Sequence, residues 1–320
     1  MGAEIFLIVV GLIILLVAGD LLVRGAVGLA AALNVPALLI SLTIVAFGTS
    51  APELVVSVQA VLSGSDGIAL GNIIGSNVAN VFLVLGLPAI IYPITTHVIG
   101  LRRHAVFMLA ATAAFAGAAY YVGYIDTRMG AALFGGIIIY VAYMWFRASH
   151  GGNEPIIDEV DEYLEASSIS AKTLLFLAAG LVGLPLGAHL LVTNGAAMAA
   201  GLGVRDELIG LTIVAFGTSL PELATVAAAA VHKKSDVAIG GIIGSNIFNL
   251  LAVGGAAGLA GKATFDAASL SVDIPVMILA SLILSAFVLT RRDIGRLSGL
   301  FLFGAYVGFI IALAKLAGGI

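Results

Sequence analysis

The chain has 320 residues, of which 61% are hydrophobic and only 10% are charged, and its mean hydropathy is +1.17. This composition is typical of an integral membrane protein and excludes an ordinary soluble domain. The net charge of −4 argues against a nucleic-acid partner. The sequence contains no cysteine, which excludes disulfides, thiolate metal sites and thiol nucleophiles.

Ten apolar stretches of about 20 residues or more are long enough to cross a bilayer. They cover residues 3–32, 37–63, 68–92, 101–122, 129–147, 171–200, 206–232, 236–260, 269–290 and 295–317. A polar, acidic connection at 148–170 separates the first five from the last five. We therefore predict a first repeat at 1–147, a cytoplasmic linker at 148–170 and a second repeat at 171–320. The linker lacks the ligand spacing of an EF-hand, so we favour a solvated connection over a calcium sensor.

Lysine and arginine residues are distributed unevenly between the two sides of the predicted bundle. Nine of them lie in loops that follow odd-numbered spans, and four lie on the opposite side. By the positive-inside rule, the 148–170 linker is cytoplasmic and both termini are outside, in a plasma or inner membrane. Because each half has five spans, the two halves enter the bilayer in opposite senses. The predicted fold is an all-α polytopic membrane protein of ten helices in two inverted-topology five-helix repeats.

Two motifs occur twice, each time 169 residues apart. Residues 39–54 read LISLTIVAFGTSAPEL and residues 208–223 read LIGLTIVAFGTSLPEL, with 14 of 16 positions identical. Residues 71–80, GNIIGSNVAN, return at 240–249 as GGIIGSNIFN. An isolated carboxylate within a membrane costs roughly 2.5–3.5 kcal/mol or more. A glutamate at matched positions of both copies, Glu53 and Glu222, therefore indicates a functional site.

The residues around Glu53 predict a broken helix. Pro52 has no N–H, so the carbonyl of Gly48 loses its helical donor, and Gly48 allows the backbone to deviate. We expect freed carbonyls over residues 46–49. Thr49 and Ser50 precede Glu53 by four and three residues, so their hydroxyls are expected on the same helical face as its carboxylate.

These oxygen groups suit hard cations such as Na⁺ and Ca²⁺. The second copy supplies the same set, with Pro221 and Gly217 as the helix breakers. Ser76 with Asn80, and Ser245 with Asn249, are four residues apart on the next span of each repeat and could complete the cage. The candidate cation ligands are Ala46, Thr49, Ser50, Glu53, Ser76 and Asn80, with Ala215, Thr218, Ser219, Glu222, Ser245 and Asn249.

Other polar residues within the spans have simpler interpretations. Asn77 and Asn246 lie about 100° around the helix from the candidate ligands, and we expect them to form interhelical hydrogen bonds. Asp20 and Arg24, four residues apart in the first span, are expected to pair with each other. His189 is interpreted as a packing residue, with a proton relay as the alternative.

The paired motifs, GTSAPE with GNIIGSNVAN and GTSLPE with GGIIGSNIFN, resemble the two α-repeats of the calcium/cation antiporter superfamily. Within it, the chain is similar to the short prokaryotic sodium/calcium exchanger relatives, including YrbG-type proteins. The resemblance implies that Glu53 and Glu222 are central carboxylates shared by calcium and sodium, with the carbonyls of Thr49 and Thr218 on calcium. It also implies alternating access, in which spans 1 and 6 slide across the other eight.

The resemblance further implies which residues flank the centre. Ala46, Ser50 and Ser76, with Ala215, Ser219 and Ser245, would line the sodium sites, and Asn80 and Asn249 would border the middle of the cluster. Some relatives, including potassium-dependent exchangers, have aspartate at the position of Asn249. The asparagine here lowers the expectation of potassium co-transport.

The predicted function is therefore exchange of Na⁺ for Ca²⁺ across the membrane, with no cofactor and no obligate protein partner. A Ca²⁺/H⁺ antiporter of the same superfamily is the alternative, although its GNATE-like run is absent. An intramembrane enzyme using the two glutamates is disfavoured, because the sequence lacks a HExxH zinc motif and a phosphate loop. A cation channel is a further alternative. It would conduct an ion without a counter-ion, so a requirement for exchange distinguishes an antiporter from a channel.

Overall fold

The computed structural model describes residues 2–149, 169–201, 215–267 and 269–316. The α-helices are α1 Gly2–Leu33, α2 Ala37–Ile40, α3 Ala46–Thr49, α4 Ala51–Leu62, α5 Asp66–Ala79, α6 Gly86–Ile91, α7 Leu101–Gly117, α8 Thr127–Ser149, α9 Ala171–Gly201, α11 Ala215–Gly217, α12 Leu220–Val231, α13 Ser235–Phe248, α14 Gly254–Ala260, α15 Ile274–Thr290 and α16 Arg296–Leu316. Among the described residues, five π-helical turns interrupt or extend them, at Ser41–Val45, Asn80–Leu85, Ala118–Val122, Asn249–Val253 and Ser269–Asp273. Two short strands, β1 Tyr124–Ile125 and β2 Ala263–Thr264, complete the structure.

The predicted all-α polytopic fold is confirmed. Within the described ranges, eight continuous helical runs are long and apolar enough to span a membrane, and 37–49 with 51–62 form a further pair bent by 43°. The span predicted at 206–232 is described only from residue 215 onward, as α11 and α12. The predicted linker at 148–170 falls almost wholly outside the described residues.

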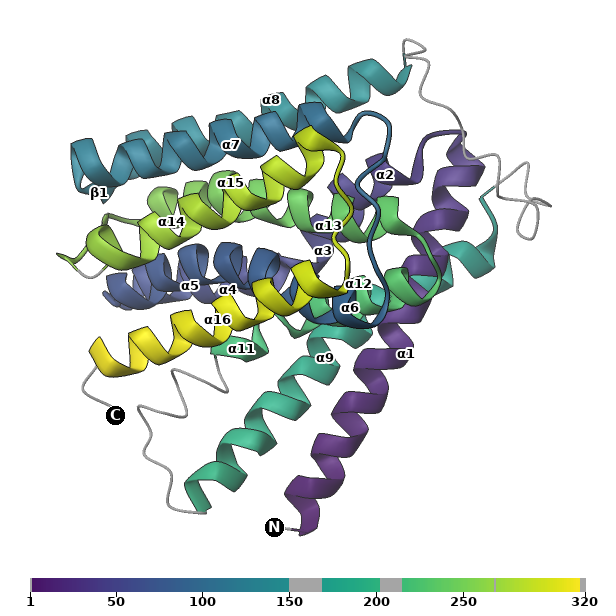
Figure 1. Ribbon diagram of the computed structural model, residues 1–320. Helices are drawn as coiled ribbons and strands as arrows, with labels where there is room; N and C mark the ends of the chain where they lie inside the picture. Colours follow the sequence, from purple (N-terminus) through teal and green to yellow (C-terminus); the bar gives the residue numbers. More distant parts are fainter. Residues whose placement is uncertain (1, 150–168, 202–214, 268, 317–320) are drawn as a thin grey trace.

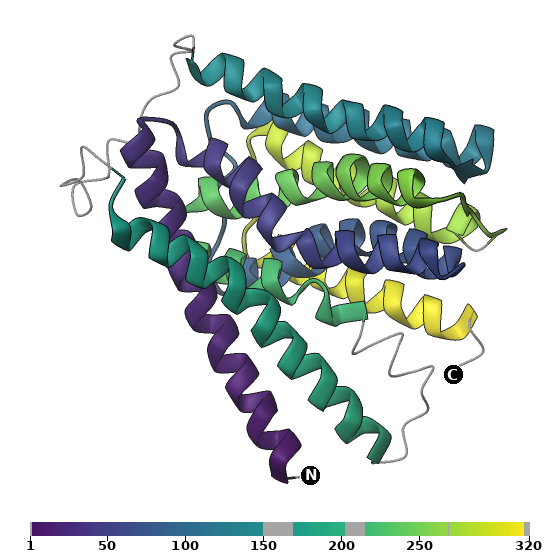
Figure 2. The ribbon, with the colours of Figure 1, turned by 180° about the vertical axis from the view of Figure 1, so that it is seen from behind.

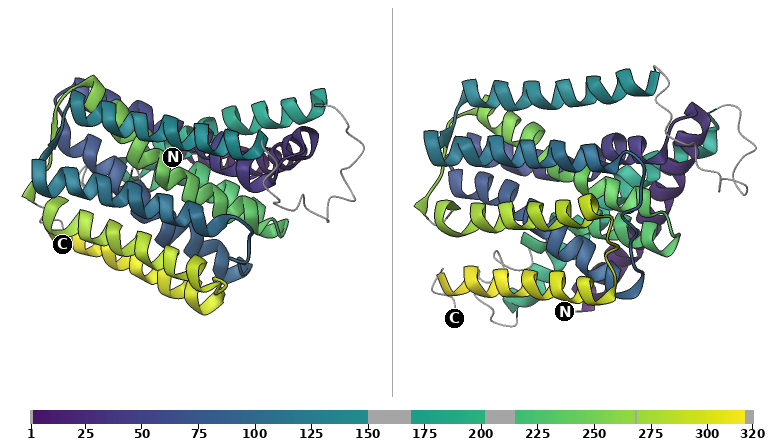
Figure 3. Two further views of the ribbon diagram at one scale, coloured as in Figure 1. Left: turned by 90° about the horizontal axis from the view of Figure 1, so that it is seen from above. Right: turned by 45° about the horizontal axis from the view of Figure 1, so that its top comes forward.

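Helices α1 and α9 lie side by side and cross the rest of the molecule at a steep angle (Figures 1 and 2). Glycines allow this close approach. A Cβ atom added at Gly11 would lie 2.8 Å from the carbonyl oxygen of Gly187, and one at Gly180 would lie 2.6 Å from the Cβ of Leu22. Small residues of this kind are a common basis of helix association in membranes, because dispersion contacts between backbones replace the hydrophobic effect. The other long helices run roughly parallel and form the body of the protein (Figure 3).

The inverted repeat is visible in the backbone pairing at the two ends of the bundle (Figure 1). At one end, β1 pairs antiparallel with β2, so that Ile125 faces Ala263. At the other end, Ile94 and Ile294 form an isolated antiparallel bridge. Shifting each residue by 169 positions converts one pair into the other. The two bridges are therefore equivalent, and in each of them a residue of repeat one pairs with a residue of repeat two.

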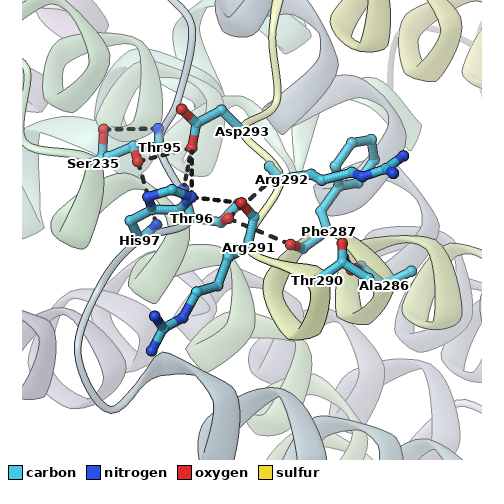
Figure 4. A network of polar contacts seen from close by, with 10 residues as sticks. All are labelled: Thr95, Thr96, His97, Ser235, Ala286, Phe287, Thr290, Arg291, Arg292 and Asp293. Atoms are coloured by element: carbon cyan, nitrogen blue, oxygen red, sulfur yellow. Dashed lines mark hydrogen bonds and ion pairs between the residues drawn. The ribbon is translucent and has the colours of Figure 1, made fainter.

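Side chains reinforce each bridge at equivalent positions. The Thr95 N–H donates to the Ser235 hydroxyl at 3.2 Å, and the Thr264 N–H donates to Asp66 Oδ2 at 2.9 Å. At the Ile94 end, Asp293 also accepts hydrogen bonds from the Thr95 hydroxyl at 2.8 Å and the Thr96 N–H at 3.1 Å (Figure 4). These contacts join the two repeats at both ends of the body.

The pseudo-two-fold axis passes between α7 and α15. The Thr112 hydroxyl donates to the Ser281 hydroxyl at 3.2 Å, and these two positions are 169 residues apart. Both side chains are buried. The sequences of spans four and nine are not recognisably similar, so their equivalence becomes clear only from this contact in the structure.

Candidate cation-binding site

Both motif helices are broken at the predicted position. In repeat one, Ser50 has φ −86° and ψ 3°, and separates α3 from α4. In repeat two, Ser219 has φ −86° and ψ 2°, and precedes α12. Pro52 and Pro221 each lie in the first turn of the following helix, where their missing N–H is not required. The breaks place Glu53 and Glu222 in the first turns of α4 and α12, where the helix dipole favours negative charge.

The motif glycines bring α9 close to both breaks. A Cβ atom at Gly48 would lie 2.0 Å from Cδ2 of Leu181, and one at Gly217 would lie 2.1 Å from Cγ2 of Val192. Neither glycine has a positive φ. Their role is thus close packing against α9, in addition to the permissive backbone that the sequence predicts.

Several of the predicted ligands meet where the two repeats cross. Glu53 is 1% exposed and Glu222 3% exposed, and the carboxylates are close enough for their charges to interact. Ser50 lies toward Glu222, and Thr49 and Ser76 are buried. Also buried are Ala46, Ser219, Ser245, Asn80 and Asn249, while Thr218 is half-buried. Ala215 belongs to α11, but its side chain is outside what the structure describes.

A hydroxyl of repeat one forms a hydrogen bond with the carboxylate of repeat two. Ser50 Oγ donates to Glu222 Oε1 at 3.3 Å. The Thr49 hydroxyl lies 3.4 Å from the Ser245 hydroxyl, which also belongs to repeat two. The break at Ser50 interrupts the continuous helix that the spacing argument assumed, so the shared helical face of Thr49, Ser50 and Glu53 stays a prediction. At Thr49 and Ser50, side chains of repeat one therefore contact side chains of repeat two.

The expectation of freed carbonyls is wrong for Ala46. Its carbonyl oxygen accepts the Ser50 N–H at 3.0 Å and the Thr49 hydroxyl at 3.4 Å. These two donors match the two lone pairs of a carbonyl oxygen. Ala46 therefore could contribute to a cation only if the Thr49 hydroxyl turned away.

Several buried oxygens at the centre have no hydrogen-bond partner among the described residues. They are Glu53 Oε1 and Oε2, Glu222 Oε2, Asn80 Oδ1, Asn249 Oδ1 and Ser219 Oγ. Buried polar atoms without partners are few in native proteins, and each requires an explanation. Carboxylate, amide and hydroxyl oxygens are the ligands that Na⁺ and Ca²⁺ prefer. The donor set therefore fits a dehydrated hard cation.

Asn80 and Asn249 each begin a π-helical turn, Asn80–Leu85 in repeat one and Asn249–Val253 in repeat two. A π-helical turn inserted in an α-helix is frequent at functional sites, because it shifts side chains and loosens the backbone hydrogen bonding. Its recurrence at equivalent positions shows that the irregularity belongs to the repeated unit. Neither segment contains a residue, such as proline, that would predict a π-helical turn from the sequence.

Asn246 and Asn72 contact this centre, whereas the interhelical hydrogen bond predicted for Asn77 is wrong. Asn246 makes the expected interhelical contact, since its Oδ1 accepts from Asn80 Nδ2 at 3.0 Å. Asn77 instead donates to the Ile73 carbonyl of its own helix at 2.7 Å. Asn72 was not among the predicted ligands, yet its Nδ2 donates to the Glu53 carbonyl at 3.1 Å. The equivalent position of repeat two is Gly241, and this difference between the repeats could have indicated a role for Asn72.

A polar contact outside the centre joins α1 to the end of α12. The predicted pair is confirmed, with Arg24 Nε 2.8 Å from Asp20 Oδ2. Asp20 Oδ1 also pairs with Nε2 of His232, which directly follows α12. Only the packing of α1 on α12 brings these residues together.

Comparison with known proteins agrees with this arrangement. The sodium/calcium exchanger protein family matches residues 3–148 and 172–315, one segment for each repeat. This chain belongs to the sodium/calcium exchanger family. Among its relatives, the putative antiporter CaxA of Alkalimonas amylolytica is 37% identical over 312 residues, covering 96% of this chain and 97% of that protein. The inner membrane protein YrbG of Escherichia coli is 34% identical over 319 residues, covering 97% and 95%.

A solved structure of the sodium-calcium exchanger NCX_Mj, soaked with Na⁺ and Sr²⁺, superposes on this chain with a TM-score of 0.82. The sequence identity is 31%, and 97% of each chain is covered. The chain is accordingly a multi-pass membrane transporter of the calcium/cation antiporter superfamily rather than an enzyme. The ten-helix inverted-repeat architecture that the sequence predicts is that of its structural relative.

Proposed function

We propose that this chain is a secondary antiporter that exchanges Na⁺ for Ca²⁺ by alternating access. The observation that carries the proposal is the burial of Glu53 and Glu222 beside each other, with three of their four carboxylate oxygens unpaired among the described residues. Two buried carboxylates require cationic partners. One Ca²⁺ or two Na⁺ neutralise them equally, which makes exchange between these ions electrostatically balanced.

The proposed ligands divide by position around the two carboxylates. Glu53 and Glu222 would be shared by both ions, and the carbonyls of Thr49 and Thr218 would bind Ca²⁺. Ser50, Ser76, Ser219 and Ser245, with Ala46 and Ala215, would line flanking Na⁺ sites, while Asn80 and Asn249 border the centre. Both ions are substrates here, and we propose no cofactor and no obligate protein partner.

Alternating access is supported by a difference between the two ends of the site. Helix α1 packs tightly on α12, since a Cβ atom at Gly19 would lie 2.7 Å from the Ala224 carbonyl oxygen. Ala224 is buried, whereas Val55, at the equivalent position of α4, is 51% exposed. One flank of the site is thus covered and the equivalent flank is open. Sliding α1 and α9 together would exchange these two environments.

The charge distribution supports the proposed orientation. Arg291 belongs to the polar network beside the Ile94–Ile294 bridge (Figure 4), and Lys234 directly precedes Ser235, whose hydroxyl accepts the Thr95 N–H. Arg102 donates to the Leu289 carbonyl near the same end. We propose that this end is cytoplasmic and that both termini are outside, in the cell membrane. The repeats at 1–147 and 171–320 and the acidic linker at 148–170 keep their proposed boundaries.

Uptake of ⁴⁵Ca²⁺ into proteoliposomes tests the function. The vesicles are loaded with Na⁺, K⁺ or acid buffer, and Glu53→Gln serves as the blank. Uptake driven only by an outward Na⁺ gradient is expected. Uptake driven by an acid interior would assign the protein to Ca²⁺/H⁺ exchange, and equal uptake under every loading would show a leak and overturn antiport.

A further inference from the structure

A hydrogen bond between two buried asparagines crosses the repeats at the centre of the site. Asn80, which begins a π-helical turn in repeat one, donates through Nδ2 to Oδ1 of Asn246 in α13 at 3.0 Å. Both side chains are at most 1% exposed. Asn246 is not among the proposed ion ligands, so its contact with one of them has no explanation so far.

The chemistry of a carboxamide makes this contact consequential. One end of the group is an NH₂ donor and the other a carbonyl acceptor, and only the oxygen can bind a cation. The two ends have nearly the same shape, so a partner must determine which end faces the ion. Because Asn246 accepts from the nitrogen of Asn80, the oxygen of Asn80 is the free end, and it has no partner among the described residues.

Asn246 is itself held in this orientation from outside the site. Its Nδ2 donates to the sulfur of Met108, in α7, at 3.8 Å. Met108 is fully buried, and a thioether sulfur is an acceptor with no hydrogen to donate. The sulfur therefore selects the nitrogen end of Asn246 and leaves its oxygen for Asn80. The chain of contacts runs from Met108 through Asn246 to Asn80.

The equivalent positions of the other repeat lack this arrangement. Asn77, the counterpart of Asn246, donates to the Ile73 carbonyl of its own helix. Asn249, the counterpart of Asn80, has neither Nδ2 nor Oδ1 paired within the described part of the chain. Only one of the two central amides is thus oriented by a neighbour.

We propose that Asn246 is a positioning residue that fixes the amide of Asn80 with its oxygen toward the transported cation, so that Asn80 is a preorganised ligand while Asn249 must orient as the ion binds. Preorganisation lowers the cost of binding, because the ligand atom needs no reorientation. Partners of this kind, one step removed from the ion, commonly change metal affinity by about 10–100-fold when removed. The inference rests on the proposed function, since it requires a cation at Glu53 and Glu222.

A double-mutant cycle on the purified full-length protein tests this role. Equilibrium binding of ⁴⁵Ca²⁺ is measured for the unmodified protein, Asn246→Leu, Asn80→Asp and the double variant. Asn246→Leu removes the acceptor, and we expect the Kd to rise about tenfold. Aspartate at position 80 presents an oxygen from either end of its side chain. In that background, Asn246→Leu is therefore expected to change the Kd less than about twofold.

The cycle separates orientation from a purely structural role. If Asn246 only ties α13 to α5, its loss weakens Ca²⁺ binding by the same factor in both backgrounds, and the proposal is overturned. An unchanged Kd in the single variant also overturns it. Asn77→Leu is the matched control, since the hydrogen bond of Asn77 goes to the Ile73 carbonyl of its own helix, and its Kd is expected to stay within about twofold.

Two further measurements keep the outcomes distinct. Thermal unfolding is recorded for every variant, and Asn246→Ala replaces Asn246→Leu if the larger side chain prevents folding. Glu53→Gln should lose Ca²⁺ binding whatever residue 246 is. Absence of Ca²⁺ binding by the unmodified protein would overturn the proposed function, whereas normal binding with an inert Asn246→Leu would overturn only the role of Asn246.

Discussion

The two repeats carry almost the same motif, yet their side chains make different contacts. Ser50 donates to Glu222 at 3.3 Å, but the hydroxyl of Ser219, its equivalent, has no partner among the described residues. Asn80 is held by Asn246, while Asn249 is unpaired by the same criterion. Identical local sequences thus adopt different environments because the surrounding helices are placed differently. Such asymmetry is what two alternative arrangements of one repeated unit require.

The largest effect is expected when either central carboxylate is removed. Glu53→Gln and Glu222→Gln are each expected to abolish Na⁺-driven ⁴⁵Ca²⁺ uptake, because a neutral amide cannot balance the charge of the cation. The two losses are expected to be equal, despite the different hydrogen bonding of the two residues. Both variants should remain inserted and monodisperse by size-exclusion chromatography. Retained uptake by both variants would remove these residues from the site.

A smaller effect is expected where α1 packs on α12. Gly19→Ala would place a Cβ atom 2.7 Å from the backbone carbonyl of Ala224, and overpacking of this kind typically costs about 1–3 kcal/mol. The equivalent position of repeat two, Ala188, already has a Cβ atom. A lower midpoint of thermal unfolding in detergent measures the cost. Gly135→Ala in α8, where nothing lies within 4 Å, is the control and should not lower it.

The smallest effect is expected at the contact between α1 and His232. Asp20→Asn removes the charge that pairs with both Arg24 and His232, and partly exposed ion pairs contribute about 0–1 kcal/mol. A decrease in unfolding midpoint smaller than that of Gly19→Ala is therefore expected. His189, at the equivalent position of repeat two, is exposed, so His189→Gln should leave the midpoint unchanged. A decrease for His189→Gln equal to that for Asp20→Asn would show that the contact with His232 contributes nothing.

The fold and the composition of the candidate site were predictable because both depend on local signals. Apolar stretches of sufficient length define the spans, and Pro52 and Pro221 define the breaks. Repetition then identifies Glu53 and Glu222, since a carboxylate in a membrane is too costly to occur twice without use. None of these inferences needs knowledge of which helix packs on which.

The contacts within the site could not be predicted in the same way. The pairing of Ser50 with Glu222 and of Asn80 with Asn246 depends on how the repeats cross. The i,i+4 spacing of Thr49 and Glu53 assumes a continuous helix, whereas the chain breaks at Ser50 between them. His232 illustrates the general reason, since its partner Asp20 is 212 residues away in the sequence.

The hydrogen bond between Thr112 and Ser281 carries a chemical constraint of its own. A position that meets its own counterpart across a two-fold axis must be complementary to itself. A charged residue would repel its copy, whereas a hydroxyl can either donate or accept, so a pair of hydroxyls can always form a hydrogen bond with each other. The contact is therefore one that two separate five-helix chains of the same sequence, inserted in opposite directions, could have formed. At the axis, this single polypeptide retains the chemistry of a symmetric dimer interface.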